Sequence, residues 1–460
     1  MHERAFSSLT LQSALIENLA SLEYLEMTPV QAQSLPHILA GKDVIAQGKT
    51  GSGKTAAFSL GLLDKLDIKQ FRVQALVLCP TRELADQVAK EIRRLARSIQ
   101  NIKVLTLCGG IPFKAQRGSM EGGAHIVVGT PGRVEEHLRR GTLTLDDLRT
   151  FVLDEADRML DMGFQSSLDA ITDCLPRERQ TLLFSATYPD EIKSIAKRIM
   201  NRPVVVQVEA THSSSTIQQH LFKVGEGASR LTALRLLLQH YRPESTLVFC
   251  NTRKETQEVA ESLHALGFSA LALHGDLEQK ERDRILVRFS NKSVSILVAT
   301  DVAARGLDID ALDAVINYRV ANDLEVHIHR VGRTGRAGSR GMACTLYSEK
   351  ERYKIERLEA YLGHSIEVEA LPPVNLRDQP AYQPAMATLQ IGGGKRQKVR
   401  AGDILGALTG DNGIEGRQVG KIQIFDQWAY VAVSRKVASH ALARLSSGKL
   451  KGRSFRVFLM

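Results

Sequence analysis

Short runs of apolar, mostly β-branched residues alternate with longer stretches of mixed polarity along the first three quarters of the chain. Runs of four or five apolar residues are typical of strands buried on both faces of a parallel sheet, and the longer stretches have the spacing of covering helices. The pattern therefore predicts an α/β architecture. Strands are expected at residues 43–46, 75–79, 104–107, 125–128, 150–153, 181–184 and 204–208, and in a second series at 246–250, 270–273, 296–299, 314–316 and 343–347.

Two segments interrupt this alternation. Residues 210–216 contain three consecutive serines and are expected to link two domains. Residues 368–385 contain four prolines, which cannot continue a helix, so a semi-extended linker is predicted there. The predicted organisation is a first domain over residues 1–209 and a second over residues 217–367, each with its own parallel sheet.

The segment 386–460 has a different pattern and is expected to form a small α+β domain. Strands and helices are predicted in the order β-α-β-β-α-β, which is the order of ferredoxin-like, RNA-recognition (RRM-like) domains. The predicted elements are strand 388–391, helix 401–408, strands 420–425 and 428–433, helix 438–445 and strand 454–459.

Charge gives this last segment a candidate role. Residues 385–460 contain 13 Lys and Arg against 4 Asp and Glu, so they carry +9 of the chain's formal charge of +10. A small basic domain on a near-neutral body favours contact with a polyanion, although a charged surface taken alone is more often only solvated.

Composition otherwise indicates an ordinary globular protein, with 43% hydrophobic and 24% charged residues. No run of about 18 apolar residues occurs, so a cytoplasmic protein is expected. The five cysteines are scattered without a Cys-x-x-Cys pair, which predicts buried free thiols in a reducing compartment.

A glycine-rich loop after the first predicted strand points to nucleotide binding. Residues 48–55 read Gly-Lys-Thr-Gly-Ser-Gly-Lys-Thr, and helical sequence follows. Glycines let backbone N–H groups surround a phosphate at a helix N-terminus, a lysine adds a positive charge, and the final threonine can bind Mg²⁺. The residues expected to bind nucleotide here are Gly48, Thr50, Gly51, Ser52, Gly53, Lys54 and Thr55.

Two adjacent acids end the fifth predicted strand. Asp154 and Glu155 open the sequence Asp-Glu-Ala-Asp. Such a pair suits metal-assisted hydrolysis, in which Asp154 would bind Mg²⁺ and Glu155 would polarise the attacking water. An acidic cluster by itself is more often a solvated turn, so the interpretation depends on the glycine-rich loop upstream.

In their order along the chain these motifs resemble those of the DEAD-box RNA helicases, and the resemblance extends over residues 1–367. It implies two tandem RecA-like lobes, ATP and Mg²⁺ as cofactors, RNA as partner, and RNA-stimulated ATP hydrolysis coupled to local unwinding. It further implies that Gln31 binds the adenine edge and that Phe6 packs on adenine. Glu23 stands where the family usually has glycine, and Met27 where it has a small residue or proline.

The resemblance also assigns residues to later steps. Arg333 and Arg336, in the sequence His-Arg-Val-Gly-Arg-Thr-Gly-Arg over residues 329–336, correspond to arginine fingers that meet the γ-phosphate of ATP. Asp308 corresponds to the aspartate that holds the ATP ribose. The residues implied to couple hydrolysis to RNA binding are Asp157, Ser185, Thr187 and His329.

RNA contacts follow by the same resemblance. They would reach the sugar-phosphate backbone, so the two lobes are expected to bind RNA with little sequence preference. The implied residues are Thr81, Arg82, Gly110, Thr130 and Arg133 in the first lobe, and Arg253, Gln279, Arg282 and Thr300 in the second.

Residues 386–460 resemble the RNA-binding domain of one bacterial branch of the family, whose target is a hairpin of 23S ribosomal RNA. This implies 23S rRNA and pre-50S ribosomal particles as partners. Lys395, Arg396 and Lys398 are favoured for phosphate contacts. Trp428 and Tyr430 are candidates for stacking on a base, but aromatic residues that alternate along a strand are as often part of the core.

Three other functions remain compatible with parts of the sequence. An ATP-gated RNA clamp or chaperone, which holds RNA without unwinding it, would need the same motifs. A helicase of the same family with a different RNA target would differ only in the last domain. A processive DNA helicase is disfavoured by the motif set and by the RNA-recognition tail. The oligomeric state is left open.

Overall fold

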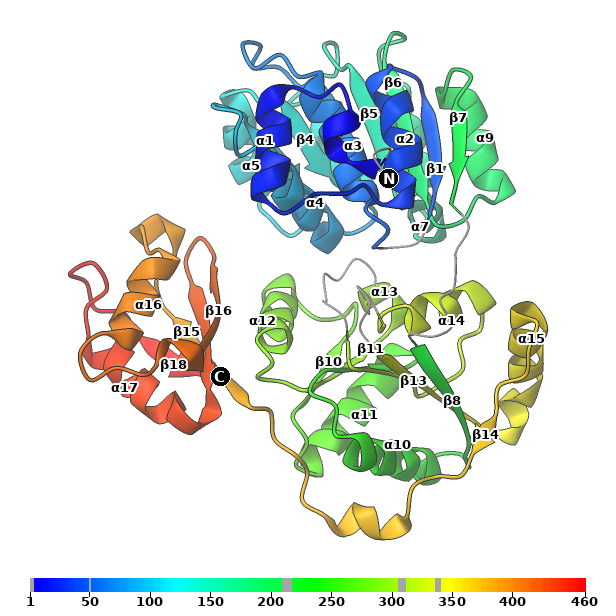
Figure 1. Cartoon of the computed structure of the whole chain (residues 1–460), viewed down its shortest axis with the longest axis vertical. Coiled ribbons are helices and arrows are strands. Elements are labelled where there is room, and N and C mark those ends of the chain that lie inside the picture. Colours follow the sequence, from blue (N-terminus) through cyan, green and yellow to red (C-terminus); the bar gives the residue numbers. More distant parts are fainter. Residues whose placement is uncertain (1–3, 49–50, 209–216, 305–311, 336–340) are drawn as a thin grey trace. The chain divides into compact units, whose positions relative to one another are not determined.

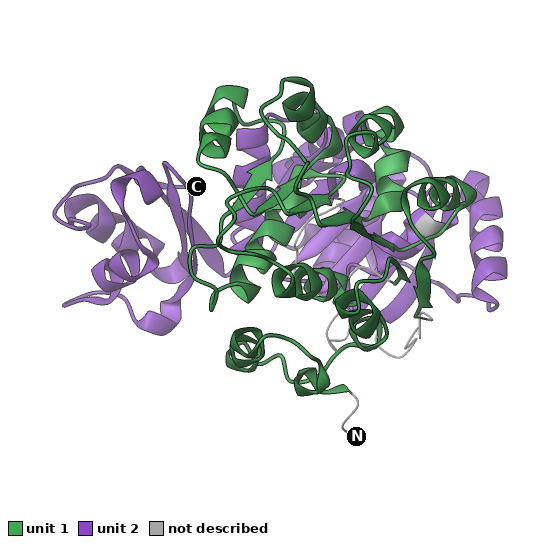
Figure 2. Ribbon diagram, turned by 90° about the horizontal axis from the view of Figure 1, so that it is seen from above, with its two compact units in different colours: residues 1–212, 306–308 green, residues 213–305, 309–460 purple. Residues whose placement is uncertain are grey.

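A computed structural model describes residues 4–48, 51–208, 217–304, 312–335 and 341–460 of the chain (Figure 1). The chain divides into two compact units (Figure 2). The described residues up to 208 form the first unit, and the described residues from 217 onward form the second.

The first unit is built on a sheet of seven parallel strands in the order β3-β4-β2-β5-β6-β1-β7. All seven strands of the first predicted series are present, and their bounds differ from the prediction by one residue at most. The strands are β1 (Val44–Gln47), β2 (Ala75–Leu78), β3 (Val104–Leu107), β4 (Ile126–Gly129), β5 (Thr150–Asp154), β6 (Gln180–Ser185) and β7 (Val204–Gln207).

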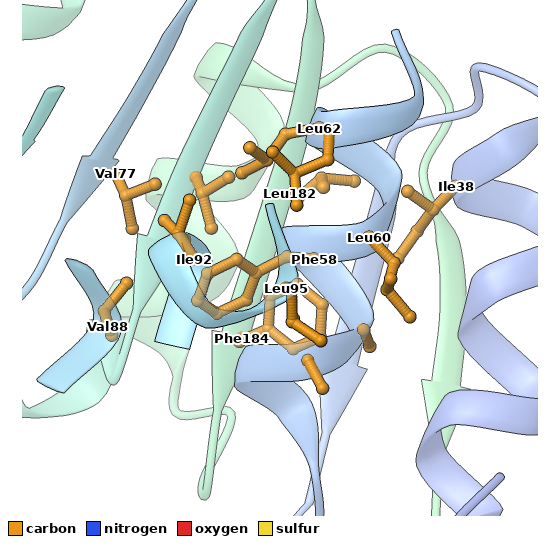
Figure 3. Packing of buried hydrophobic residues seen from close by; sticks show 14 of the residues in the cluster. Ile38, Phe58, Leu60, Leu62, Val77, Val88, Ile92, Leu95, Leu182 and Phe184 are labelled. Atoms are coloured by element: carbon orange, nitrogen blue, oxygen red, sulfur yellow. The ribbon is translucent and has the colours of Figure 1, made fainter. Parts of the chain in front are cut away.

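Helices cover both faces of this sheet, which explains why its strands are mostly apolar. On one face, Phe58 of α3 packs against Phe184 of β6 with ring centroids 5.3 Å apart, and Ile92 of α4 lies beside them (Figure 3). The helical elements are η2 (Phe6–Ser8), α1 (Ser13–Ser21), α2 (Pro29–Leu39), α3 (Lys54–Asp64), α4 (Arg82–Leu95), α5 (Phe113–Glu121), α6 (Pro131–Arg139), α7 (Ala156–Asp161), α8 (Gln165–Thr172) and α9 (Asp190–Ile199).

The second unit begins with a sheet whose connectivity repeats that of the first, in the order β10-β11-β9-β12-β13-β8-β14, again with parallel strands. Its strands are β8 (Ile217–Lys223), β9 (Thr246–Phe249), β10 (Ala270–Leu273), β11 (Ile296–Ala299), β12 (Ala314–Asn317), β13 (Gly341–Tyr347) and β14 (Val368–Glu369). The sequence pattern did not indicate β8, which carries polar residues at three consecutive positions, or β14, which is only two residues long. β14 extends this lobe past the boundary expected at residue 367.

Seven helical elements accompany this sheet. Most of their bounds fall in the stretches of mixed polarity between the predicted strands. They are α10 (Ala228–Tyr241), α11 (Arg253–Ala265), α12 (Gln279–Ser290), α13 (Asp301–Ala304), α14 (Leu324–Val331), η3 (Glu349–Glu351) and α15 (Arg352–Leu362).

The proline-containing segment expected to be a linker is held along the second lobe. It contains the short 3₁₀ helix η4 (Val374–Asp378). The Gln239 amide of α10 donates hydrogen bonds to the Gln379 and Pro380 carbonyls, at 3.0 and 3.2 Å. Tyr382 packs edge-on against Phe268, with ring centroids 5.8 Å apart. These contacts fix the path of the segment.

The chain ends in a four-stranded antiparallel sheet of order β16-β17-β15-β18. Its elements follow the predicted β-α-β-β-α-β order, and the two helices cover one face of the sheet (Figure 1). The elements are β15 (Met386–Ile391), η5 (Lys395–Gln397), α16 (Ala401–Thr409), η6 (Gly416–Gln418), β16 (Val419–Ile424), β17 (Ala429–Ser434), η7 (Arg435–Val437), α17 (Ala438–Ser447) and β18 (Val457–Leu459). The predicted fold class, two parallel-sheet lobes followed by a small α+β domain, is confirmed.

All five cysteines are free thiols. Four are buried as predicted, but Cys174 is exposed because it lies just past the end of α8. Over the described ranges, none of the helices has the length and apolar character needed to cross a membrane.

Candidate functional site

The candidate residues of the first lobe lie along one edge of its sheet and are grouped there by their expected ligand. The glycine-rich loop follows β1, Asp154 ends β5 and Ser185 ends β6, and these three strands are neighbours in the order β5-β6-β1. The expected RNA contacts follow the neighbouring strands β3-β4-β2, with Thr81 after β2, Gly110 after β3 and Thr130 after β4. Carboxyl ends of parallel strands meet at one edge, where ligands of such sheets bind. The topology therefore places the residues expected to bind phosphate, here called the phosphate half, beside those expected to bind RNA, the RNA half.

The glycine-rich loop is closed by its own lysine. Gly51 and Gly53 have φ angles of 82° and 91°, which residues with a Cβ rarely adopt. Lys54 is the first residue of α3, and its Nζ donates a hydrogen bond of 2.5 Å to the Gly48 carbonyl. Thr55 is half-buried on the next position of the helix. The loop thus brings a buried ammonium group and a helix N-terminus together.

Gln31 joins α2 to this loop. Thr28 caps α2, and the Gln31 Oε1 atom accepts a hydrogen bond of 2.8 Å from the Thr28 backbone N–H. The Gln31 Nε2 atom donates to the Gly53 carbonyl at 3.0 Å. A side-chain amide has two hydrogens and two lone pairs, so one donor and one acceptor remain. That pair is what the edge of adenine requires.

Phe6 lies in a less open position than the sequence implied. Its side chain is only 2% exposed and packs edge-on against Tyr24, with ring centroids 6.1 Å apart. Neighbouring Glu23 has a φ angle of 61°, a left-handed conformation that costs a non-glycine residue about 1 kcal/mol. This conformation gives a physical reason for the glycine that the family pattern has at that position. In this structure the Phe6 ring offers no free face to a ligand.

The two acids after β5 are buried. Asp154 and Glu155 are 3% and 6% exposed. Burial, followed by the charge of Glu155, raises the pKa of Asp154 to about 7, although the Lys54 charge acts in the opposite direction. Glu155 has a φ of 54°, and Arg158 holds its carboxylate in an ion pair of 2.7 Å. A buried carboxyl whose ionised form is this disfavoured fits a site that a cation completes.

Asp157 connects α7 to the end of β6. Its Oδ2 atom accepts hydrogen bonds from the Ala186 N–H, the Thr187 N–H and the Thr187 hydroxyl at 3.2, 2.9 and 3.0 Å. The Asp157 N–H donates to the Ser185 hydroxyl at 3.3 Å. Burial alone would raise the pKa of Asp157, but the Thr187 hydrogen bonds and the Arg158 charge leave it below its ordinary value. Three of the four predicted coupling residues therefore form one network.

The RNA half of the first lobe has its own network. Thr81 caps α4, and the Arg82 guanidinium lies close over Gly109, where a Cβ would come within 2.7 Å of it. Arg133 Nη1 donates to the Gln116 Oε1 atom at 2.7 Å and to the Ile111 carbonyl at 2.8 Å. The Gln116 amide in turn donates to the Cys108 carbonyl at 2.8 Å. Buried Gln116 thus ties the loop after β3 to the start of α6.

The second lobe places its candidate residues in the same way. Arg253 follows β9, Gln279 follows β10 and Thr300 follows β11, and these strands are neighbours in the order β10-β11-β9. Arg253 forms an ion pair of 2.6 Å with Asp276, and Gln279 donates to Asp283 at 2.9 Å. Arg282 lies on the first turn of α12. The side chains are therefore gathered at one edge but held by acids of the lobe.

Arg330 fixes the segment that carries the expected arginine fingers. Its buried guanidinium contacts both carboxylate oxygens of Asp301, at 2.6 and 2.7 Å, and donates to Asn251 at 2.8 Å. It thereby joins α14 to the ends of β11 and β9. Arg333, one turn further on, is 6% exposed, and His329 is half-buried on α14. Thr50, Asp308 and Arg336 lie outside the described residues.

The basic residues of the last domain are exposed. Lys395 and Arg396 lie on η5, Lys398 directly follows it with a φ of 59°, and all three side chains face solvent. The Lys451 ammonium donates to the Lys398 carbonyl at 3.0 Å and so brings a fourth positive charge to this corner. The Lys395 and Arg396 N–H groups donate to the Phe425 and Asp426 carbonyls, so the cluster lies beside the turn between β16 and β17.

The sheet face opposite the two helices is packed on α12 and the turn after it. Tyr430 is 5% exposed and lies close to Arg284, and Lys280 lies 5.5 Å from the centre of the Trp428 ring. The fully buried Thr388 hydroxyl pairs with that of Ser293 at 2.6 Å. Trp428 and Tyr430 are therefore engaged by the second lobe, and the centre of this face is closed to bases in this structure.

Three residues that hold candidate side chains in place were not singled out from the sequence. Gln116, Arg158 and Arg330 act through partners that are known only from the folded chain. Arg158 and Arg330 stand beside recognised motifs, and that proximity is the one signal that could have indicated them. Gln116 has no such signal, since it is an isolated polar residue in a polar helix.

Three family models match consecutive parts of the chain. The model for the DEAD/DEAH box helicase matches residues 28–195, and the model for the helicase conserved C-terminal domain matches residues 229–338. The model for the DbpA RNA binding domain matches residues 388–458. The matches fall on the first sheet, the second sheet and the four-stranded domain.

Known proteins are similar to nearly the whole chain. "ATP-dependent RNA helicase DbpA" of Escherichia coli (strain K12) is 51% identical over 457 residues, 99% of each chain. The protein of the same name from Bacillus subtilis (strain 168) is 34% identical over 472 residues, 98% of each chain. The structure of S. cerevisiae Dbp5 bound to RNA and ADP BeF3 is 31% identical, covers 80% of this chain and 96% of its own, and has a TM-score of 0.73.

These matches agree with the motifs in kind and in order. The glycine-rich loop, the buried acids and the network around Asp157 lie in the first matched segment, and Arg330 and Arg333 lie in the second. The chain belongs to the DEAD-box family of ATP-dependent RNA helicases and ends in an RNA-binding domain of the DbpA type.

Proposed function

We propose that this helicase couples RNA-stimulated ATP hydrolysis to the local opening of short duplexes in the large ribosomal subunit as it is assembled in the cytoplasm. The last domain would direct it to a hairpin of 23S rRNA on pre-50S particles. The observation that carries the proposal is the placement of the candidate residues after neighbouring strands of each lobe's sheet, together with an exposed basic cluster in the last domain.

The chemical step is assigned to residues of the phosphate half. Lys54 would contact the β- and γ-phosphates, and Asp154 with Thr55 would hold Mg²⁺, whose charge offsets that of the phosphates when it is bound. The buried position of Asp154 and its raised pKa support this assignment. Glu155 would take a proton from the attacking water, and Gln31 would bind adenine with its remaining donor and acceptor.

The second lobe is assigned the charge stabilisation of the transition state. Arg333 and Arg336 would act as arginine fingers on the γ-phosphate, and Asp308 would hold the ribose. The rigid attachment of α14 through Arg330 supports a positioned Arg333. Hydrolysis would be coupled to RNA through the network of Asp157 with Ser185 and Thr187, and through His329.

RNA would be held by both lobes through its backbone. In the first lobe the contacts would come from Thr81, Arg82, Gly110, Thr130 and Arg133. In the second lobe they would come from Arg253, Gln279, Arg282 and Thr300. Their placement after neighbouring strands supports a continuous contact along each sheet edge. Backbone contacts carry little sequence information, so selectivity is left to the last domain.

Glu155→Gln tests the chemistry. The amide keeps the size of the carboxylate but cannot act as a base, so ATP and RNA should still bind while hydrolysis stops. Binding of a fluorescent ATP analogue and release of phosphate would be measured on the full chain with Mg²⁺ present. Turnover at the wild-type rate in this variant would refute the role of Glu155.

The role of the last domain in selecting the RNA target is tested by removing positive charge from its basic cluster. Replacing Lys395, Arg396 and Lys398 together by alanine should weaken binding of a 23S hairpin fragment and lower its salt dependence, because fewer counterions are released. The matched control replaces three exposed basic residues of the first lobe, Lys42, Lys69 and Arg72, by alanine. It changes the charge by the same amount and should bind the hairpin as the wild type does.

A chain ending after Gln383 provides a second test, because residues 371–383 pack on the second lobe and must be kept. It should retain RNA-stimulated ATPase activity and lose the preference for the hairpin over random RNA of equal length. If the shortened chain still prefers the hairpin, the last domain does not select the RNA target.

An ATP-gated RNA clamp or chaperone is the alternative, and a different RNA target is another. Displacement of a short labelled strand, measured with ATP and with a non-hydrolysable analogue, separates unwinding from clamping. ATPase stimulation by 23S fragments, random RNA and DNA compares the targets. Stimulation by DNA equal to that by RNA would contradict the proposed substrate.

A further inference from the structure

One aromatic side chain on the sheet of the last domain stays exposed. In the antiparallel pairing of β15 with β18, Phe458 lies opposite Gln390, and Leu389 and Ile391 lie opposite Leu459 and Val457. Directly opposed residues share a face of the sheet. Leu389 and Ile391 belong to the core under the helices, so Phe458 points to the other face. Its side chain is 50% exposed, because the second lobe covers the inner strands and not the edge strand β18.

Gln390, which lies opposite Phe458 on this face, is only 5% exposed, whereas half of the Phe458 side chain stays open. Arg456 precedes it by two residues and so lies on the same face. The Arg456 carbonyl accepts a hydrogen bond of 2.9 Å from the backbone N–H of Gly392, which therefore lies beside it, directly after the end of β15. Because Gly392 has no side chain, the backbone beside Arg456 is uncovered, as at sites where a ligand approaches a strand closely.

The charge near this face selects an anionic ligand. Residues 449–456 contain Lys449, Lys451, Arg453 and Arg456 and no Asp or Glu. Lys451 has an ion pair of 3.4 Å with Asp403, but within the described part of the chain neither Arg453 nor Arg456 has a carboxylate partner. An exposed ring beside uncompensated guanidinium groups is suited to a base with its phosphate, since every base has a flat face that can stack.

We propose that Phe458 and Arg456 form a site for one nucleotide of single-stranded RNA at the edge of the sheet. The base stacks on the Phe458 ring, and Arg456 contacts the adjoining phosphate. The two residues of this site differ from those of the Lys395, Arg396 and Lys398 cluster, and from Trp428 and Tyr430, which the second lobe engages. This inference rests on the proposed RNA-binding role of the last domain and adds sequence-tolerant binding of an unpaired nucleotide to it.

The test uses the full chain without ATP and a fluorescent single-stranded RNA of about ten nucleotides, which is within the span of such binding surfaces. Fluorescence anisotropy at several salt concentrations gives the affinity and its salt dependence. Phe458→Ala should weaken binding about 5- to 100-fold with the salt dependence unchanged, because a stacking contact releases no counterions. Phe458→Tyr keeps an aromatic ring and should bind the RNA with the wild-type affinity. Arg456→Ala should lower the magnitude of the salt slope by about 0.7.

Leu459→Ala is the matched control, since Leu459 is the next residue, is equally exposed and belongs to the opposite face. It should bind the RNA as the wild type does. Phe458→Leu separates stacking from general apolar contact, because leucine keeps the apolar surface without a ring. Wild-type affinity in Phe458→Leu overturns the stacking site.

The remaining outcomes separate this inference from the proposed function. If alanine at Lys395, Arg396 and Lys398 weakens RNA binding but Phe458→Ala does not, the nucleotide site is refuted and the RNA-binding role stands. If neither change weakens binding, both fail. If Phe458→Ala leaves RNA affinity unchanged but abolishes self-association in sedimentation, the exposed ring is a contact between copies of the chain, and the nucleotide site is again refuted.

Discussion

The ion pair between Glu155 and Arg158 should control both the stability and the activity of the first lobe. The two side chains are 7% and 5% exposed and their charged atoms are 2.7 Å apart. Arg158→Met keeps most of the volume and leaves the Glu155 carboxylate buried beside Asp154 without its partner. Removal of one member of a buried pair costs about 3–5 kcal/mol. About 3 kcal/mol corresponds to a roughly 100-fold increase in local opening.

Hydrogen exchange is the suitable assay, because the chain's one tryptophan, Trp428, lies in the last domain and cannot report on the first lobe. Amides of β5 and α7 should lose about 100-fold in protection in Arg158→Met. Arg139→Met is the control, because the ion pair of Arg139 with Glu135 spans 3.5 Å and Arg139 is 68% exposed. The free energy of unfolding should therefore fall by less than about 1 kcal/mol in this variant.

A double-mutant cycle then isolates the pair. Combining Arg158→Met with Glu155→Gln removes both charges, so the double variant should be more stable than Arg158→Met alone, with a coupling of about 1–3 kcal/mol. ATP hydrolysis should also fall in Arg158→Met, since Glu155 loses the group that orients it. Equal losses of protection in Arg158→Met and Arg139→Met, or strictly additive effects in the cycle, would refute the argument.

Three further outcomes are expected. Arg333→Ala should lower the rate of hydrolysis at least about 1000-fold while the affinity for ATP changes little, as titration with a fluorescent analogue would show; equal losses in both would indicate a structural arginine. Burial and the Arg330 charge lower the pKa of His327 to about 4, whereas the pKa in the unfolded chain is about 6.5. The contribution of neutral His327 to the free energy of unfolding is therefore present above pH 6.5 and is lost as the pH falls towards 4. The free energy of unfolding of the second lobe, measured with urea, should fall by about 2 kcal/mol between pH 7 and pH 5, and it should not fall in this way in His327→Leu. Thr388→Val leaves Ser293 and Asn291 without their partner, which costs about 1–3 kcal/mol, so the emission of Trp428 should shift to the red; an unchanged spectrum would show that these hydrogen bonds do not hold the contact.

The sequence by itself determined the family, the order of the domains and most strands. Apolar runs such as residues 296–299 form strands because a parallel sheet buries both of their faces. The loop at residues 48–55 could be interpreted because its glycines and lysine act on a phosphate as one local unit. Nothing local indicated β8 or β14: β8 has mixed polarity, and both strands exist because neighbouring strands supply their hydrogen bonds.

Only the tertiary structure decided which side chains are available. Phe6 is buried against Tyr24, and Tyr430 is covered by the second lobe, whereas Phe458 stays exposed on an edge strand. The roles of Gln116 and Arg330 were equally hidden, because their partners are distant in sequence. Local sequence determines chemical type and favours a backbone conformation, but burial and hydrogen-bond partners depend on segments that meet only after folding.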